Sequence, residues 1–124
     1  RGEGVTRHRP PALPESVVMR QCADYAVMRG ALVIRVNAGA MPTPDGRWFR
    51  ASRWRAPGHL WHETGVSDLV IVWRGRVFVV ETKAGSNVIS PTQDEFLEAA
   101  DEAGAVVVVA YSVEDLRSAM EEIC

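Results

Sequence analysis

The pattern of apolar positions divides the chain into an irregular start and an ordered remainder. Residues 1 to 14 contain three prolines and scattered arginines without periodicity, which favours a flexible arm or linker over a packed element. In residues 15 to 29 apolar side chains recur three and four positions apart, and a glycine follows as a stop. The sequence therefore predicts an amphipathic first helix and, from its length, a single domain over residues 15 to 124.

Two further helices are predicted in the second half of the chain. Ser90 supplies an N-cap, Pro91 suits the first helical position, and Gln93 closes a capping box. This helix should run from Pro91 to about Ala103, where a glycine ends it. A last helix is expected over residues 113 to 121.

Strand patterns fill the space between these helices. Residues 31 to 36, 46 to 54, 66 to 73 and 76 to 82 have strand-like composition and are separated by turn residues. Residues 105 to 111 are continuously apolar and β-branched, as in a strand buried on both faces. Because a helix precedes this last strand, we expect a parallel crossover. The predicted class is α/β, with a mixed central sheet flanked by helices in the order αβββαβ.

The hairpin around Arg74 and Gly75 brings two carboxylates together. Two residues between strand patterns favour a tight turn, in which paired positions have numbers that sum to 149. In that register Asp68 lies opposite Glu81, with their side chains roughly 5 Å apart on one face. Like charges at that spacing destabilise a sheet, so the register predicts a neutralising cation, for which Mg²⁺ is the natural candidate.

Lys83 is a second cation in this region. Strand alternation places it on the same face as Glu81, and it is the only lysine in a chain with thirteen arginines. An ammonium group can approach a water or a phosphate as a point charge, and its pKa can be lowered, which a guanidinium does not readily allow. An ordinary ion pair beside a strand-ending Asp68 is the competing interpretation. The three residues together, in this register, favour a catalytic site.

The net charge of −2 hides an asymmetry between the two halves of the chain. Residues 1 to 62 carry ten arginines against four acids, giving +6, whereas residues 63 to 124 carry four cations against twelve acids, giving −8. The first half could face phosphate, or the halves could be solvated surfaces of opposite sign. The candidates for DNA contact are Arg35, Asn37, Arg47, Arg50, Arg53 and Arg55.

Other titratable side chains have more than one interpretation. Glu15, one turn before Met19 on the apolar stripe, would point toward the interior and could be a third metal carboxylate, although the helix dipole also favours an acid in a first turn. His59 and His62 could bind metal or DNA, but we leave these loop residues outside the active site. The two cysteines lack metal-ligand spacing and are expected to be free thiols.

No apolar stretch approaches the roughly 20 residues that a membrane span requires. The beginning of the chain also lacks the pattern of a signal peptide. An intracellular, cytoplasmic location is therefore the default expectation.

The stretch from Gly65 to Lys83, a GVSD sequence followed by a hairpin and ETK, resembles the PD-(D/E)XK nuclease superfamily. Adding Glu15, the RVNAG of residues 35 to 39, the capped helix and the AGAVVVVAYSVEDL ending, residues 15 to 118 resemble a VRR-NUC domain, the virus-type replication-repair nuclease module. This resemblance implies a restriction-endonuclease-like core and a bacterial or phage origin. It also implies a Mg²⁺- or Mn²⁺-dependent endonuclease, expected as a homodimer, that cuts branched DNA such as Holliday junctions or flaps in repair, recombination or phage replication.

The resemblance also implies roles for individual residues. Metal carboxylates would be Asp68, Glu81 and Glu15, with the Thr82 carbonyl as a further ligand, Lys83 as the catalytic lysine and Gln93 close to the active site. One departure is Met19, where many members have a glutamine. Competing interpretations are an inactive nucleic-acid-binding module of the same fold, a restriction-like or RNA-cleaving nuclease, and a structural α/β domain.

Overall fold

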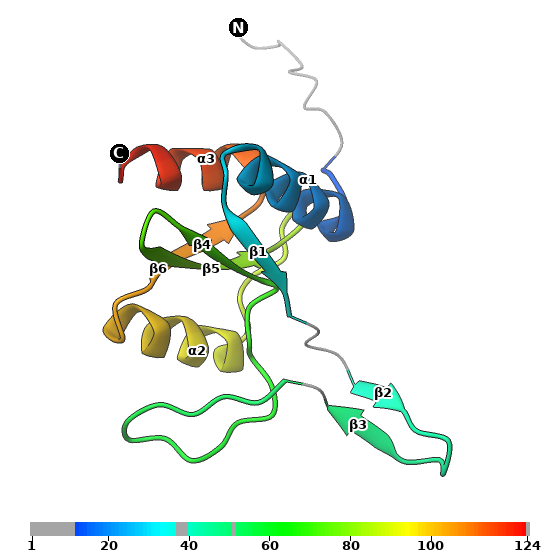
Figure 1. Ribbon diagram of the computed structural model, residues 1–124. Helices are drawn as coiled ribbons and strands as arrows, with labels where there is room; N and C mark the ends of the chain where they lie inside the picture. Colours follow the sequence, from blue (N-terminus) through cyan, green and yellow to red (C-terminus); the bar gives the residue numbers. More distant parts are fainter. Residues whose placement is uncertain (1–11, 37–39, 51, 124) are drawn as a thin grey trace, which may run out of the picture.

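A four-stranded mixed sheet forms the centre of the protein (Figure 1). The structure is a computed structural model that describes residues 12 to 36, 40 to 50 and 52 to 123, so the predicted arm lies almost wholly outside it. Across the sheet the strands are β1 (Leu32–Arg35), β4 (Leu69–Trp73), β5 (Arg76–Thr82) and β6 (Val106–Ala110). Strand β4 is antiparallel to both of its neighbours, whereas β5 and β6 are parallel, as the crossover predicts.

Helices cover both faces of this sheet (Figure 1). α1 (Glu15–Met28) and α3 (Val113–Glu121) lie on one face, and α2 (Pro91–Glu102) lies on the other. The predicted capping box of α2 is present, because Ser90 Oγ accepts from the Gln93 N–H at 3.2 Å and Gln93 Oε1 accepts from the Ser90 N–H at 2.9 Å. No helix in the described part of the chain is long and apolar enough to cross a membrane.

The main core lies between the sheet and the pair α1 and α3. Its fully buried members from the helices include Val18, Cys22, Leu116 and Met120. Alternate residues of the central strands complete this core: Leu69, Ile71, Trp73, Phe78 and Val80. By alternation the side chains of Val70 and Val72 in β4, and of Val77, Val79 and Glu81 in β5, lie on the opposite face, toward α2. Glu81 therefore belongs to the α2 side of the sheet.

The predicted hairpin register is confirmed from Trp73, opposite Arg76, to Leu69, opposite Val80. Arg74 and Gly75 have φ values of 50° and 75°, as a type I′ turn requires at both central positions. Strand β4 starts at Leu69, later than predicted, because the backbone before it turns away to meet α2.

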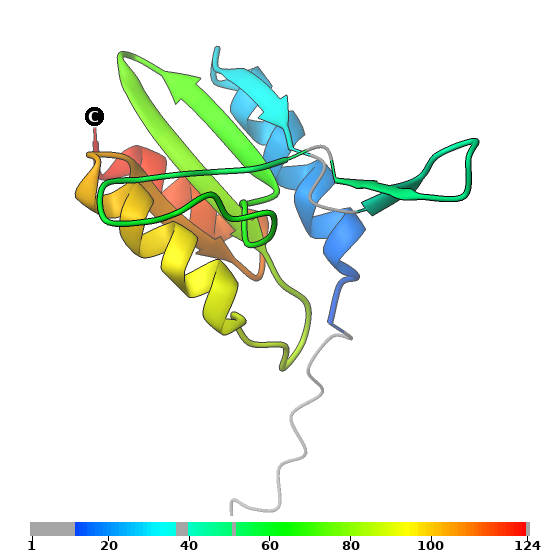
Figure 2. The ribbon, with the colours of Figure 1, turned by 90° about the horizontal axis from the view of Figure 1, so that it is seen from below.

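A short second hairpin projects from the body (Figures 1 and 2). It pairs β2 (Ala40–Pro42) with β3 (Trp48–Arg50). The strand predicted over residues 46 to 54 is thus much shorter, and β2 lies where a loop was predicted. Two prolines around Thr43 obscured the strand pattern, and Thr43 instead closes the turn by donating its N–H to Arg47 O at 2.7 Å.

The prediction that β6 is buried on both faces is only partly right. Val108 and Ala110 are buried against the main core, but Val106, Val107 and Val109 are half-buried. The reason is that β6 lies at the edge of the sheet. Helices α2 and α3 both pack on it, so both of its faces are apolar, while its outer edge has no strand partner in the described part of the chain.

Candidate active site

Glu81 is the centre of a polar cluster at the end of β5. Only 3% of its surface is exposed. Its Oε2 accepts from Gln93 Nε2 at 3.1 Å and lies 3.9 Å from Lys83 Nζ. Its Oε1 is buried and has no hydrogen-bond partner among the described residues. A buried carboxylate oxygen without a partner is costly, so this atom is available to bind a ligand that offsets the cost.

The surroundings of Glu81 raise its pKa from 4.5 to about 8. Desolvation by burial is the largest cause, followed by the negative charge of Asp68. Lys83 lowers the pKa, but its effect is smaller than those two. The ordinary ion pair considered from the sequence would hold the pKa down, so Lys83 alone does not neutralise this carboxylate.

Asp68 is held against the end of β5 by Thr82. The Thr82 N–H donates to Asp68 Oδ2 at 2.8 Å, and Thr82 Oγ1 donates to the same oxygen at 2.7 Å. The Val36 N–H donates to Asp68 O at 2.9 Å, which extends the β1 to β4 ladder by one residue. Asp68 lies close enough to Glu81 for its charge to raise the pKa of that residue, and two donors from Thr82 fix its carboxylate. The paired residues of β4 and β5 end at Leu69 and Val80, so the direct pairing of Asp68 with Glu81 stays a prediction.

Glu15 approaches this cluster from the start of α1. It is exposed, so the expectation that it points into the interior is wrong. Asn87 Nδ2 lies 3.5 Å from Glu15 Oε1, and the charge of Glu15 contributes to the raised pKa of Glu81. Glu15 is therefore at the open rim of the cluster. The sequence did not indicate Asn87, because nothing local shows that its loop returns to α1.

Gly65 allows the GVSD segment to pass close to the backbone of α2. Its φ is 95°, and a Cβ at this position would overlap the backbone carbonyl of Thr92 in the first turn of α2. Only glycine tolerates both conditions. Two residues later Ser67 is fully buried, with Oγ 3.2 Å from the carbonyl oxygen of Leu69. The close approach of Gly65 to Thr92 brings the Asp68 segment against α2, the helix that carries Gln93.

The donor set of this cluster fits a hard divalent cation. Asp68 and Glu81 present carboxylate oxygens side by side, Glu15 lies at the rim, and Glu81 Oε1 lacks a partner. Mg²⁺ binds through a few carboxylates and keeps several waters, which the half-buried Asp68 and the exposed Glu15 permit. The structure therefore brings Asp68, Glu81, Lys83 and Gln93 together. Ligation by the Thr82 carbonyl stays a prediction.

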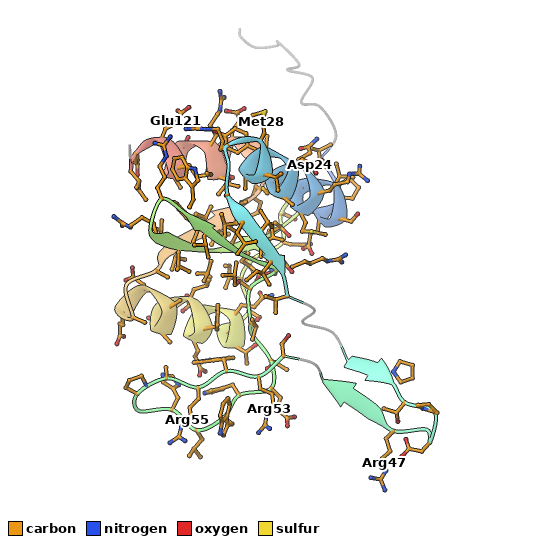
Figure 3. The ribbon with its side chains drawn as sticks, in the orientation of Figure 1. Asp24, Met28, Arg47, Arg53, Arg55 and Glu121 are labelled. Atoms are coloured by element: carbon orange, nitrogen blue, oxygen red, sulfur yellow. The ribbon has the colours of Figure 1, made fainter. Side chains whose placement is uncertain are left out.

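The arginines predicted to contact DNA lie on separate segments. Arg47 is at the tip of the projecting hairpin, 3.7 Å from Asp45, and Arg53 and Arg55 extend from the following loop (Figure 3). Arg35 is exposed at the end of β1. Asn37 and the side chain of Arg50 lie outside the described part of the structure.

The loop over residues 52 to 64 carries a feature that the sequence analysis missed. Trp61 is 56% exposed, and the guanidinium of Arg53 lies 5.1 Å from the centre of its ring. Leu60 beside it is also exposed. An exposed aromatic ring can stack on a nucleic-acid base, and an arginine beside it can add a cation–π contribution. The signal available from sequence was a Leu-Trp pair within an arginine-rich loop.

Comparisons with known proteins bear on the fold. No family model and no curated protein matches this chain. A solved structure described as a "VRR_NUC domain" superposes with a TM-score of 0.59 and 22% sequence identity, over 89% of this chain and 97% of that chain. The predicted α/β class and the resemblance to a VRR-NUC domain are thus confirmed at the level of fold. Activity must be argued from the side chains.

Proposed function

We propose that this protein is a Mg²⁺- or Mn²⁺-dependent endonuclease that hydrolyses phosphodiester bonds in DNA, with a preference for branched substrates such as Holliday junctions or flaps. The observation that carries the proposal is the pairing of buried Glu81 and Lys83 with the half-buried Asp68, in which Glu81 Oε1 has no partner among the described residues. Two adjacent carboxylates, one of them buried, are unfavourable together unless a proton or a cation offsets their charge, and the raised pKa of Glu81 reflects this cost. The fold shared with a VRR_NUC domain agrees with this function.

Each residue of the proposed active site has its own role in phosphodiester hydrolysis. Asp68 and Glu81 would hold the cation, with Glu15 at the open side, and Thr82 and Gln93 orient the two carboxylates. When bound, a divalent cation would act as a Lewis acid and lower the pKa of a nearby water, so that the water could lose a proton and attack phosphorus in line as hydroxide. Lys83 Nζ, held 3.9 Å from Glu81, can orient that water and stabilise the negative charge that develops on the phosphate oxygens.

DNA contact would use the basic first half of the chain. Arg53 and Arg55 project from one loop and Arg47 from the neighbouring hairpin (Figure 3), so a backbone lying across both segments could meet them in turn. Arg35, Asn37 and Arg50 complete the proposed set. Such phosphate contacts position a duplex without reading its sequence, which suits an enzyme that recognises DNA shape. Trp61 could stack on a base exposed at a branch.

A homodimer is also part of the proposal. A branched junction with two-fold symmetry can receive two symmetry-related cuts from an enzyme that has the same two-fold symmetry. Sedimentation equilibrium of the free protein and of its junction complex measures this directly. If the free protein and its junction complex both contain a monomer, the proposal of a homodimer is wrong. The proposed cleavage chemistry does not depend on that result.

The test is cleavage of labelled four-way junction, flap, duplex, single-stranded DNA and an RNA hairpin, with Mg²⁺, Mn²⁺ or EDTA. Wild-type protein is compared with Asp68→Ala and Lys83→Ala, and Glu98→Gln on the exposed side of α2 is the matched control. We expect metal-dependent cutting of branched DNA, reduced at least about a hundredfold in the two site variants and unchanged in the control.

Each other outcome selects a different function. Binding of branched DNA without cutting by the wild type would favour the inactive binding module. If the protein cuts only RNA, or cuts duplex DNA at one sequence, the proposed substrate is wrong but the proposed active site still holds. Neither binding nor cutting in low salt, where phosphate contacts are strongest, would overturn the proposal.

A further inference from the structure

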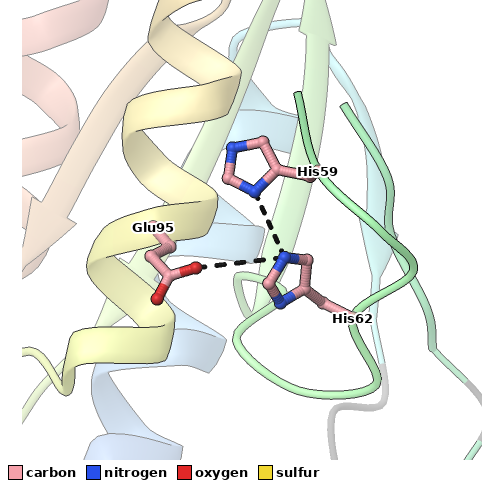
Figure 4. A group of neighbouring side chains, drawn as sticks. All are labelled: His59, His62 and Glu95. Atoms are coloured by element: carbon pink, nitrogen blue, oxygen red, sulfur yellow. Dashed lines mark hydrogen bonds and ion pairs between the residues drawn. The ribbon is translucent and has the colours of Figure 1, made fainter. Parts of the chain in front are cut away.

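Three side chains of metal-ligand type meet between the loop over residues 52 to 64 and helix α2. Figure 4 shows His59 and His62 from the loop pointing toward Glu95 on the helix. His59 Nδ1 lies 3.2 Å from His62 Nε2, and His62 Nε2 lies 3.9 Å from Glu95 Oε2. One candidate ligand atom from each residue lies within 4.8 Å of the others.

This cluster is separate from the candidate active site. Gln93 directs its side chain to Glu81, and Glu95 follows two residues later on the same helix. Side chains two positions apart leave an α-helix in directions about 200° apart. Helix α2 thus presents one face to the active-site carboxylates and another to the two histidines.

The loop is held in a shape that points both histidines at the helix. Trp54 and His62 exchange backbone hydrogen bonds at 3.0 and 2.9 Å. The buried Trp54 ring stacks on the His62 ring, with centroids 4.3 Å apart, and meets the edge of Phe96 on α2 at 5.4 Å. Trp54 Nε1 also donates to Thr64 O at 2.9 Å. The shape of the loop and the orientation of the His62 ring are therefore fixed by contacts that do not involve the three candidate ligand atoms.

The donor set and its spacing select one class of ion. Two imidazole nitrogens and one carboxylate oxygen suit Zn²⁺ and related transition metals, whereas Mg²⁺ favours oxygen ligands. Ligands about 2.0 to 2.1 Å from a tetrahedral zinc ion are roughly 3.3 Å from one another. The separations of 3.2 and 3.9 Å approach that geometry. Three protein ligands would leave a fourth position for water.

We propose that His59, His62 and Glu95 bind a transition-metal ion of the Zn²⁺ class, which fastens the loop over residues 52 to 64 to α2. The site needs no contribution from Asp68 or Glu81, so it stands whether or not the protein is a nuclease. Its effect would be to fix the segment that carries Arg53, Arg55 and Trp61. The alternative is a neutral N–H···N hydrogen bond between the two rings, which needs no metal.

The binding test uses the full chain freed of metal and titrated with Co²⁺ and Zn²⁺. The variant Asp68→Asn removes binding at the first site, so only the second is followed. We expect one Co²⁺ per chain with the absorption bands of a four-coordinate nitrogen and oxygen site. Competition with a coloured chelator should show Zn²⁺ affinity reduced more than about 100-fold by His59→Asn or His62→Asn. Glu95→Gln should weaken binding about tenfold, and its neighbour Glu98→Gln not at all.

Tryptic cleavage after Arg53 and Arg55 tests whether the ion fastens the loop. Zn²⁺ should slow this cleavage at least about tenfold in wild type and not in His59→Asn, whose circular dichroism and thermal midpoint in EDTA verify that it folds. Zn²⁺ binding that survives both histidine substitutions would overturn the proposal. So would a wild-type protein that binds no Zn²⁺ at about 100 µM, which would leave only the hydrogen bond between the rings.

Discussion

Replacement of Glu81 by glutamine should stabilise the metal-free protein at alkaline pH. Glu81 is 3% exposed and has a pKa of about 8, raised mainly by burial and by Asp68. An unfolded chain releases this proton near pH 4.5, whereas the folded protein keeps it until about pH 8. Across that interval the folded state binds more protons, so the free energy of unfolding falls as the pH rises. Glutamine occupies the same space without the charge.

The magnitude follows from the two pKa values. At about 1.36 kcal/mol per pH unit, the interval from 4.5 to about 8 corresponds to a loss of up to about 5 kcal/mol in the free energy of unfolding. Small domains have total stabilities of about 5 to 15 kcal/mol, so the metal-free protein should be markedly weakened near pH 8.5. Below about pH 4 this position is largely neutral in the folded and unfolded states of both proteins, so their stabilities should be similar.

The assay is denaturant unfolding in EDTA at a series of pH values, for wild type, Glu81→Gln and the exposed control Glu98→Gln. The difference between wild type and Glu81→Gln isolates this group, because histidines and the remaining acids titrate in both proteins. The charged groups around it, Asp68, Lys83 and Glu15, are also unchanged. Added Mg²⁺ at about pH 8.5 should restore stability to wild type and do little for the variant. Parallel pH curves for the two proteins would refute the reasoning.

Four further predictions concern single contacts. Gly65→Ala should cost about 1 to 3 kcal/mol more in denaturant unfolding than Gly58→Ala, because both have positive φ but only Gly65 faces a backbone oxygen. Burial, with a smaller effect of Asp115, raises the pKa of the Cys22 thiol to about 11; mass spectrometry after alkylation at about pH 8 should find it unmodified until the protein unfolds. Thr82→Val should weaken Mg²⁺ binding measured by calorimetry about tenfold, since it removes one donor to Asp68. Trp61→Ala should lower affinity for branched DNA about tenfold in a fluorescence titration and leave thermal stability unchanged.

The parts of the fold that the sequence predicted well depend on local chemistry. The capping box of α2 needs only Ser90 and Gln93 in one helical turn, and the turn at Arg74 and Gly75 needs only two residues that accept positive φ. Once that turn is fixed, strand alternation determines the rest of the pairing. The meeting of Asp68 with the end of β5 is a consequence of that register.

The parts that the sequence could not predict depend on how distant segments pack. Glu15 fits a helical apolar stripe, yet it is exposed, because the core ends before the first turn of α1 reaches it. His59 and Glu95 are separated by more than thirty residues, and they meet only because Trp54 packs against Phe96. Nothing in the spacing of loop histidines identifies a glutamate on another element as their neighbour.

The electrostatics of Glu81 decide between the two interpretations that its sequence left open. A structural ion pair would give Lys83 the dominant effect and lower the pKa of Glu81, and it would leave neither oxygen without a partner. Here the pKa is raised, Asp68 outweighs Lys83, and Oε1 is unpartnered among the described residues. The lysine is thus an insufficient counter-charge for two adjacent carboxylates. Under the proposed function a divalent cation would supply the remaining positive charge, so the two carboxylates whose proximity weakens the metal-free protein at alkaline pH would also bind that cation.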